Sequence, residues 1–230
     1  MCLVSYIPLP EGYLISSNRD EYVDRNATDI VTEQVGKARL YYPQDTKGGS
    51  WIIASDVKVQ IVVLNGAFEN HKRKLPYRKS RGVMMKELFE YDSVVDFFEQ
   101  YDFVGIEPFT MIIAGDAFLY EFRWDGFVKH VKELSKKSVH VWSSCTLYDH
   151  DAADRREKLL KNELSHLTEA TISSYAAAHQ YIHPEDERQG LKVKLLENLR
   201  TISHTQIVVD KEVTLIHDDL LSGAKKTLKI

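Results

Sequence analysis

The sequence is poor in cysteine, proline and glycine: its 230 residues include 2 Cys, 6 Pro and 11 Gly. This composition excludes a disulfide scaffold and a collagen-like chain. An excess of one charge is also lacking, because 30 Lys and Arg stand against 34 Asp and Glu, a net charge of −4. General nucleic-acid binders normally carry a basic footprint, so nucleic acid is not an expected partner.

Long hydrophobic runs are missing as well. The longest apolar stretches, such as residues 61–64, have the length of a strand, whereas a membrane-spanning helix needs about 20 residues. The chain does not begin with a charged segment followed by an apolar one, so no signal peptide is expected. Two cysteines do not form a disulfide framework, and the expected location is therefore cytoplasmic.

The hydrophobic pattern predicts blocks of strands and blocks of helices. Strands are expected at 2–7, 13–17, 51–55, 59–64, 110–114, 118–124, 127–131, 139–144, 202–209, 213–216 and 226–230. Helices are expected at 83–89, 94–101, 151–164, 172–181 and, more weakly, 191–199. Blocks without β-α-β alternation indicate an α+β fold with mostly antiparallel sheets covered by helices. No linker-like stretch divides the chain, so one domain over residues 1–230 is expected.

Cys2 directly follows the initiator Met and opens a predicted strand. Cytosolic processing usually removes Met before a small residue, and this would leave Cys2 with a free α-amine. An amine with a pKa of about 8 beside a thiol with a pKa of about 8.5 forms a nucleophile that carries its own base. The alternative is a cysteine that only packs within its strand.

Polar residues follow two of the apolar strands. Asn18-Arg19-Asp20-Glu21 is either a solvated strand end or a group that orients a thiolate and an α-amine, since Arg favours the thiolate and Asp accepts from the ammonium. Asn65 is either the first residue of an Asn-Gly turn or an oxyanion donor pointing into a cleft. The glycines of Gly48-Gly49 permit tight backbone geometry.

Six Lys and Arg residues fall within positions 72–81. They form either a solvated loop or an anion site beside the cleft, and Arg81 is the member most expected to matter. No metal site is expected, although His179 and His183 have an i, i+4 spacing, because Pro184 ends that helix and no third ligand is evident.

Five short motifs occur in the order and rough spacing of the NRDE family, which is also called the transport and Golgi organisation 2 family. These motifs are Met1-Cys2, Asn18-Arg19-Asp20-Glu21, Gly48-Gly49-Ser50-Trp51, Leu64-Asn65-Gly66 and Ser80-Arg81-Gly82. The chain resembles that family mainly over residues 1–90. The family in turn resembles N-terminal nucleophile hydrolases of the bile-salt hydrolase and penicillin acylase type, so the resemblance implies a four-layer αββα sandwich.

The resemblance also assigns roles to particular residues. Cys2 matches the catalytic nucleophile, Arg19 and Asp20 match the pair that positions it, and Asn65 matches the oxyanion-hole amide. Ligand-binding roles are expected for three further residues of the motifs: Asn18, Trp51 and Arg81.

Two functions stay open at this stage. One is hydrolysis of a small non-peptide amide by Cys2 without any required cofactor. The other is non-catalytic binding and trafficking of haem or of an acyl-lipid or acyl-coenzyme A ligand, because family members have been linked to haem trafficking and lipid metabolism. The chain carries Ser143-Ser144-Cys145 where many relatives have Ser-Asn, so the resemblance leaves open whether it is an enzyme. Both functions expect a small-molecule ligand and no membrane span, and neither indicates an oligomeric state.

Overall fold

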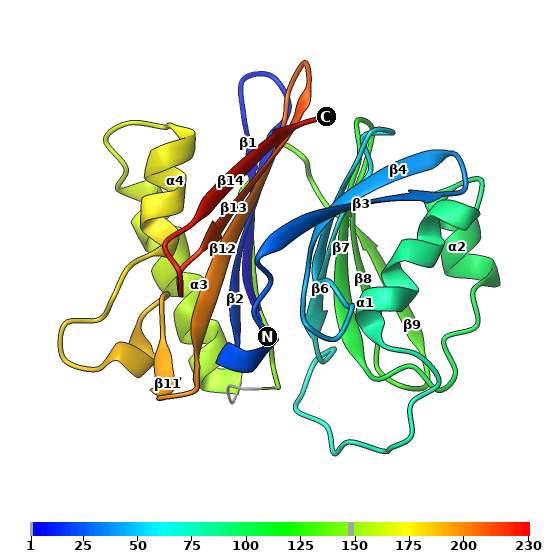
Figure 1. The fold of residues 1–230 in the computed structure, drawn as a ribbon, viewed down its shortest axis with the longest axis horizontal. Helices are drawn as coiled ribbons and strands as arrows, with labels where there is room; N and C mark the ends of the chain where they lie inside the picture. Colours follow the sequence, from blue (N-terminus) through cyan, green and yellow to red (C-terminus); the bar gives the residue numbers. More distant parts are fainter. Residues whose placement is uncertain (1, 147–149) are drawn as a thin grey trace.

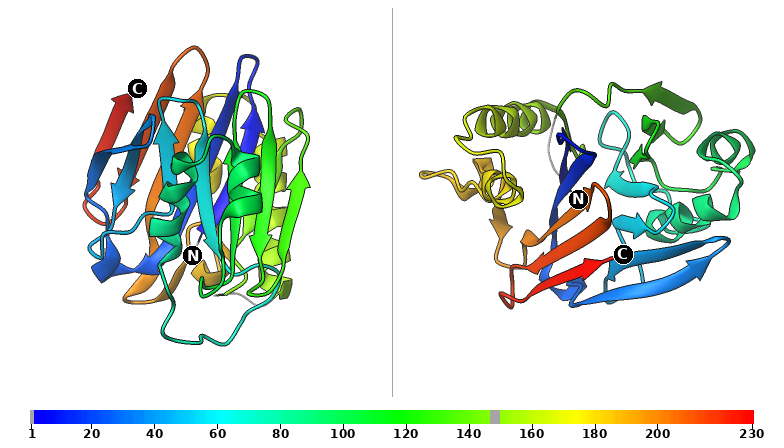
Figure 2. Two further views of the ribbon diagram at one scale, coloured as in Figure 1. Left: turned by 90° about the vertical axis from the view of Figure 1, so that its right-hand side faces the viewer. Right: turned by 90° about the horizontal axis from the view of Figure 1, so that it is seen from above.

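Two antiparallel β-sheets stack face to face, and helices cover the outer face of each sheet (Figures 1 and 2). The computed structural model describes residues 2–146 and 150–230. The layers follow one another as helices, sheet, sheet and helices (Figure 1). The predicted α+β class, the mostly antiparallel sheets and the αββα architecture are therefore confirmed.

The first sheet, called here the β1 sheet, contains the N-terminal and the C-terminal strands. Its strand order is β10 (His140–Ser143), β1 (Cys2–Pro8), β2 (Tyr13–Tyr22), β12 (Leu199–Val209), β13 (Val213–Asp219) and β14 (Lys225–Lys229), and β11 (Lys194–Leu196) pairs with β12. Strand β2 lies between β1 and β12, so both of its edges are hydrogen-bonded.

The second sheet, called here the β6 sheet, follows the order of the chain. Its strands are β3 (Asp29–Val35), β4 (Ala38–Gln44), β5 (Ile52–Ser55), β6 (Gln60–Asn65), β7 (Phe109–Ala114), β8 (Leu119–Trp124) and β9 (Lys129–Glu133). Each strand pairs antiparallel with the next one. The sheet is thus a simple meander.

The helices form the two outer layers. Helices α3 (His150–Ser165) and α4 (Ile172–His179) cover the β1 sheet, while α1 (Arg81–Met84), the 3₁₀ turn η2 (Met85–Glu90) and α2 (Val94–Gln100) cover the β6 sheet (Figure 1). Two further 3₁₀ turns are η1 (Val23–Arg25) and η3 (Glu187–Gln189). Among the described helices, none is long and apolar enough to cross a membrane.

Apolar side chains fill the spaces between these layers. Val4 and Ile15 of the β1 sheet pack with Val62 and Ile112 of the β6 sheet in the space between the two sheets. An aromatic cluster, to which Phe103 belongs, fills the space beneath α2. Burial of one such large apolar side chain contributes about 1.5–3 kcal/mol, so these cores fix how the layers stack.

The structure corrects three parts of the sequence-based assignment. The expected helix at 191–199 is wrong: the segment leads into β11 and the start of β12. The buried Leu191 and Val193 alternate with Lys192, as in an extended segment, and Val193 is hydrogen-bonded to Thr201 of β12. Strand β3 was not predicted, since it is a largely polar edge strand. Strand β2 also runs five residues beyond the predicted 13–17, through a polar stretch that is buried between its two neighbours.

Docking of α3 on the β1 sheet can be tested at Leu160, which is fully buried beside Leu3 and Val141. We expect Leu160→Ala to lower the free energy of unfolding by about 2–5 kcal/mol, because the change leaves a cavity under the helix. Urea unfolding followed by circular dichroism measures this. Val131→Ala, at a half-exposed position of β9, is the control and should change stability by less than about 0.5 kcal/mol. Equal effects of the two changes would contradict the helix docking.

Candidate functional site

Cys2 is the first residue of β1 and is buried directly opposite Arg19 of β2. Residues directly opposite each other in an antiparallel pair project to the same face of the sheet. Cys2 packs in the core between the two sheets, so Arg19 also projects toward the β6 sheet. The structure therefore brings the predicted nucleophile and the predicted arginine together on one face.

The guanidinium of Arg19 is almost wholly buried and is held on three sides. It donates to Asp45 Oδ2 at 2.8 Å and to the carbonyl oxygen of Arg25 at 2.7 Å. Its Cζ lies 4.1 Å from the ring centroid of Trp51, a cation–π contact. Arg25 donates to the same oxygen of Asp45 and, at 2.9 Å, to Glu21. A buried cation is thus paired within a network of two arginines and two carboxylates.

A tight turn between β4 and β5 presents Asp45 to this network. Asp45 Oδ1 accepts the backbone N–H groups of Lys47 and Gly49, each at 3.0 Å, and the Asp45 carbonyl accepts from Gly48 at 2.9 Å. Gly48 has a φ of 76°, which glycine adopts without strain. The Gly48-Gly49 motif therefore shapes the turn that holds the partner of Arg19.

The environment sets the charge states of these groups. Burial raises the pKa of the Cys2 thiol, and the positive charge of Arg19 offsets only part of that rise. The resting thiol is therefore neutral at neutral pH, and a reaction at its sulfur needs a base to accept the proton. Burial also disfavours the charged form of Asp45, but Arg19 and Arg25 outweigh this effect and hold the pKa of Asp45 below its ordinary value.

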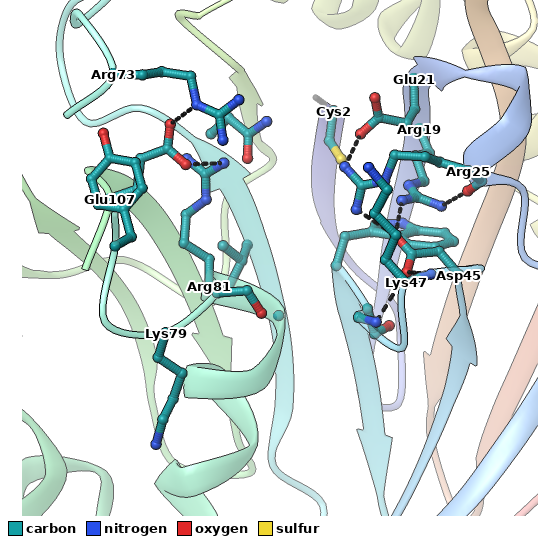
Figure 3. Close-up of a pocket in the computed structure, with 18 of the residues that line it drawn as sticks. Cys2, Arg19, Glu21, Arg25, Asp45, Lys47, Arg73, Lys79, Arg81 and Glu107 are labelled. Carbon is teal, nitrogen blue, oxygen red and sulfur yellow. Dashed lines mark hydrogen bonds and ion pairs between the residues drawn. The ribbon is translucent and has the colours of Figure 1, made fainter. Parts of the chain in front are cut away.

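A cavity of about 600 Å³ opens beside Cys2, as Figure 3 shows. Arg19, Trp51 and Asn65 line it together with Cys2. These residues come from β1, β2, the residue before β5 and the end of β6. The cavity is large enough for a small organic molecule.

Asn65 is the last residue of β6 and lines the cavity. Its carbonyl oxygen accepts from Ser144 Oγ at 2.9 Å. Gly66 follows with a φ of 81°, and a Cβ there would lie 2.4 Å from Cys145 Sγ. The backbone at Asn65 continues the pairing of β6 with β7, because Asn65 lies opposite Phe109 and the Gly66 N–H donates to the Pro108 carbonyl. Asn65-Gly66 is therefore not a hairpin turn, and Asn65 lines the cavity with Cys2.

A second group of charged residues lines the cavity across from Cys2 (Figure 3). Arg81, at the start of α1, donates to the Pro108 carbonyl at 3.0 Å and pairs with Glu107 at 3.1 Å. The same carboxylate pairs with Arg73 at 3.3 Å and with His71 at 3.2 Å. Three of the six basic residues at 72–81 line the cavity: Arg73, Lys79 and Arg81.

The other two predicted residues lie on the opposite face of β2, since side chains alternate along a strand. Asn18 donates to the carbonyls of His179 and Leu191, at 2.7 and 3.0 Å, and contacts His204. Burial lowers the pKa of His204 to about 3, so this histidine is neutral. Asn18 is thus buried beneath α4, and the structure does not bring it to the cavity.

Asp20 shares that face. Its carboxylate accepts from Arg156 of α3 at 2.9 Å and from Thr201 of β12 at 2.7 Å. Arg156 reaches this carboxylate from the helix layer that covers the β1 sheet. Asp20 therefore ties the end of β2 to the helix layer, while its neighbour Arg19 lies beside Cys2.

Sequence reasoning missed Asp45, Arg25 and Glu107. Asp45 had a usable signal, because an Asp just before a Gly-Gly pair is typical of a side chain that closes its own turn. Arg25 and Glu107 had none, since Arg25 lies in the 3₁₀ turn η1 and Glu107 in a loop, and each meets its partners only after folding.

The pairing of Asp45 predicts how stability depends on pH. Asp45→Asn should lower the free energy of unfolding by about 3–5 kcal/mol at pH 7, because it leaves the buried Arg19 without its counterion. The pKa of folded Asp45 is lowered, so its contribution is present above the unfolded pKa of about 3.9 and is lost as the pH falls through the folded value.

Urea unfolding between pH 7 and pH 3 measures this contribution. The difference in free energy of unfolding between the parent and Asp45→Asn should become smaller below about pH 4. Asp92→Asn, at a side chain that is 96% exposed, is the control and should leave the pH dependence of the free energy of unfolding unchanged. A difference in free energy of unfolding that stays constant down to pH 3 would contradict the pairing of Asp45 with Arg19.

Comparison with known proteins identifies the fold. No protein-family profile matches the chain, and neither does any curated protein sequence. Among solved structures, the chain is similar to penicillin V acylase from Agrobacterium tumefaciens, with a TM-score of 0.66 and 10% identity over 100% of this chain and 86% of that one. It is also similar to a cysteine-to-alanine mutant of conjugated bile acid hydrolase from Clostridium perfringens, with a TM-score of 0.63 and 8% identity over 100% of this chain and 92% of that one. The chain therefore has the fold of the N-terminal nucleophile hydrolases.

Proposed function

We propose that this chain is an amidohydrolase of the NRDE family that uses Cys2 as an N-terminal nucleophile on a small, non-peptide amide. The observation that carries the proposal is the position of Cys2, which begins β1, lies beside Arg19 and lines a cavity of about 600 Å³. Similarity to the folds of penicillin V acylase and conjugated bile acid hydrolase supports it. Cys2 and Cys145 are both free thiols, in keeping with a cytoplasmic location.

The first half of the reaction transfers the acyl group to the protein. Removal of Met1 gives Cys2 a free α-amine, and this amine takes the proton from the neutral thiol. The sulfur attacks the amide carbonyl, and the carbonyl oxygen becomes an oxyanion that Asn65 stabilises by donating a hydrogen bond. The protonated amine then gives its proton to the leaving nitrogen. The C–N bond breaks, and a thioester on Cys2 remains.

The second half releases the acid. Water attacks the thioester carbonyl, the α-amine accepts a proton from that water, and the carboxylic acid leaves as the Cys2 thiol re-forms. Arg19 favours the thiolate at both stages through its positive charge, and Asp45 holds its guanidinium in place. Asp20 has a positioning role, since its pairing with Arg156 fixes the strand end that carries Arg19.

A second candidate function is binding without catalysis. The chain would then hold haem, an acyl lipid or an acyl-coenzyme A in the same cavity and pass it on, with Trp51 and Arg81 as contacts. The observation that favours this candidate is the set of cationic side chains that line the cavity around the buried Cys2. A carrier needs such an anion-binding cavity but no activated nucleophile.

Substitution of Cys2 separates the two functions. We expect Cys2→Ala to abolish release of amine from a panel of acyl amides, because no other group in the proposal forms the thioester. Cys145→Ser is the matched control and should keep at least half of the parent rate. The carrier function instead predicts that Cys2→Ala binds haem or acyl-coenzyme A as tightly as the parent does. Equal amide hydrolysis by Cys2→Ala and its parent would disprove the proposal.

Asn65 provides a test of the oxyanion step. Asn65→Ala should lower kcat by about 100–1,000-fold with little change in KM, because the hydrogen bond acts on charge that develops in the transition state. Steady-state kinetics on the best amide of the panel measure both constants. Asn162→Ala, on α3, is the control. A rise in KM at unchanged kcat would instead assign Asn65 to ground-state binding.

A further inference from the structure

The most exposed apolar side chains lie on loops at one end of the β6 sheet. Among the residues that the structure describes, the three most exposed large hydrophobic side chains are Phe127 at 81%, Leu75 at 71% and Val104 at 68%. They lie in the segments that join β8 to β9, β6 to α1 and α2 to β7. Because each strand of this meander is antiparallel to the next, the end of β6, the start of β7, the end of β8 and the start of β9 lie together. The three segments therefore meet at the same end of the sheet.

Contacts between the three loops hold their tips side by side. The N–H of Arg78 donates to the Gly105 carbonyl at 2.8 Å and joins the 66–80 loop to the α2–β7 segment. Lys74 Nζ lies 5.5 Å from the ring centroid of Phe127, a cation–π contact that joins the same loop to the β8–β9 turn. Figures 1 and 2 show the 66–80 loop projecting from this end of the molecule. The exposed apolar side chains thus stand on adjoining loops.

Positive charge accompanies the apolar tips. Residues 70–80 contain five Lys and Arg and no Asp or Glu, in a chain whose net charge is −4. Three of the five pair with carboxylates: Arg73, Arg78 and Lys79. The other two, Lys72 and Lys74, are exposed, and neither pairs with a carboxylate of residues 2–146 or 150–230. These two lysines and the apolar side chains of Leu75, Val104 and Phe127 are called here the loop-tip surface.

The composition of the loop-tip surface favours a lipid surface over a protein partner. Lysine is depleted in protein–protein interfaces, since its strongly hydrated ammonium is costly to bury. A membrane with anionic lipids accepts apolar side chains below its headgroups and attracts lysines at the level of the phosphates. The apolar side chains also stand on three separate loops. Each of them can enter a fluid bilayer, which needs no partner surface of matching shape.

We propose that the loop-tip surface docks the chain on membranes that contain anionic phospholipids. Phe127, Val104 and Leu75 enter the bilayer below the headgroups, and Lys72 and Lys74 lie beside the lipid phosphates. Leu75 also lines the Cys2 cavity, so a docked membrane lies next to that cavity. The docking does not rest on the proposed hydrolysis, because it needs neither the Cys2 thiol nor a free α-amine.

Cosedimentation of the full chain with lipid vesicles tests the docking. One set of vesicles contains phosphatidylcholine and phosphatidylserine in a ratio of three to one, and the other contains phosphatidylcholine alone. We expect the parent to bind the anionic vesicles about tenfold more strongly than the neutral ones at low salt, because two lysines face the anionic headgroups. This preference should disappear at 1 M salt, where the charges are screened.

Two kinds of variant separate the apolar and the charged contributions. Phe127→Ser should weaken binding to both sets of vesicles about tenfold, and Val104→Ser about fivefold, since each removes an apolar side chain from the bilayer. The double variant Lys72→Gln with Lys74→Gln should lose the preference for anionic vesicles and keep the binding to neutral ones. All four positions are exposed, so the variants should fold, and circular dichroism checks this.

The matched controls lie at the opposite ends of the two sheets. Val57→Ser changes an exposed apolar residue in the turn between β5 and β6, and Lys211→Gln changes an exposed lysine in the turn between β12 and β13. Both controls should bind each set of vesicles as the parent does.

Three outcomes would overturn the membrane docking. The first is a parent that stays in the supernatant with both sets of vesicles. The second is equal binding by Phe127→Ser and Val57→Ser, which would place the bound surface elsewhere. The third is a parent that ignores vesicles but forms a dimer that Phe127→Ser dissociates in size-exclusion chromatography, because the loop-tip surface would then contact a second copy of the chain. A chain without amidase activity would end the hydrolase proposal and leave these measurements intact.

Discussion

The antiparallel register that sets Cys2 opposite Arg19 is the constraint on which the site depends. It directs the thiol and the guanidinium to the face between the sheets, and alternation sends Asn18 and Asp20 to the helix-covered face. A slip of one residue would exchange these two sets and bury Asp20 against the β6 sheet. Because β12 pairs with the other edge of β2, both of its neighbours hold this register.

Burial of Arg19 has consequences for the elements around it. A guanidinium removed from water needs a counterion and further acceptors, and Asp45 together with the Arg25 carbonyl supplies them. The turn that presents Asp45 also leads into Trp51, whose ring covers the same guanidinium. One buried cation thus joins the β1 sheet to the β4–β5 turn and shapes one side of the cavity.

Periodicity in the sequence was enough to predict the α+β class and most strands, because the apolar residues of β6 and β7 form uninterrupted buried runs. The αββα sandwich was predicted from the family resemblance. Periodicity did not predict β3, because β3 is a largely polar strand at the edge of its sheet. The motifs at Cys2, Arg19 and Asn65 led to residues that the fold brings to one cavity. That Asn18 and Asp20 project to the other face of β2 could be known only from the strand register. The ion pair between Arg73 and Glu107 depends on the conformation of loops, which the local sequence does not specify.

The central claim is that Cys2 acts with its own α-amine, and the state of the N-terminus tests it most directly. The measurement is the intact mass of the untagged chain, followed by its mass after incubation with slowly hydrolysed acyl amides. The account predicts a mass short by one methionine residue and then an added acyl group on the Cys2 peptide. A chain that hydrolyses amides while retaining Met1 would contradict the account, because its α-amine would not belong to the nucleophile.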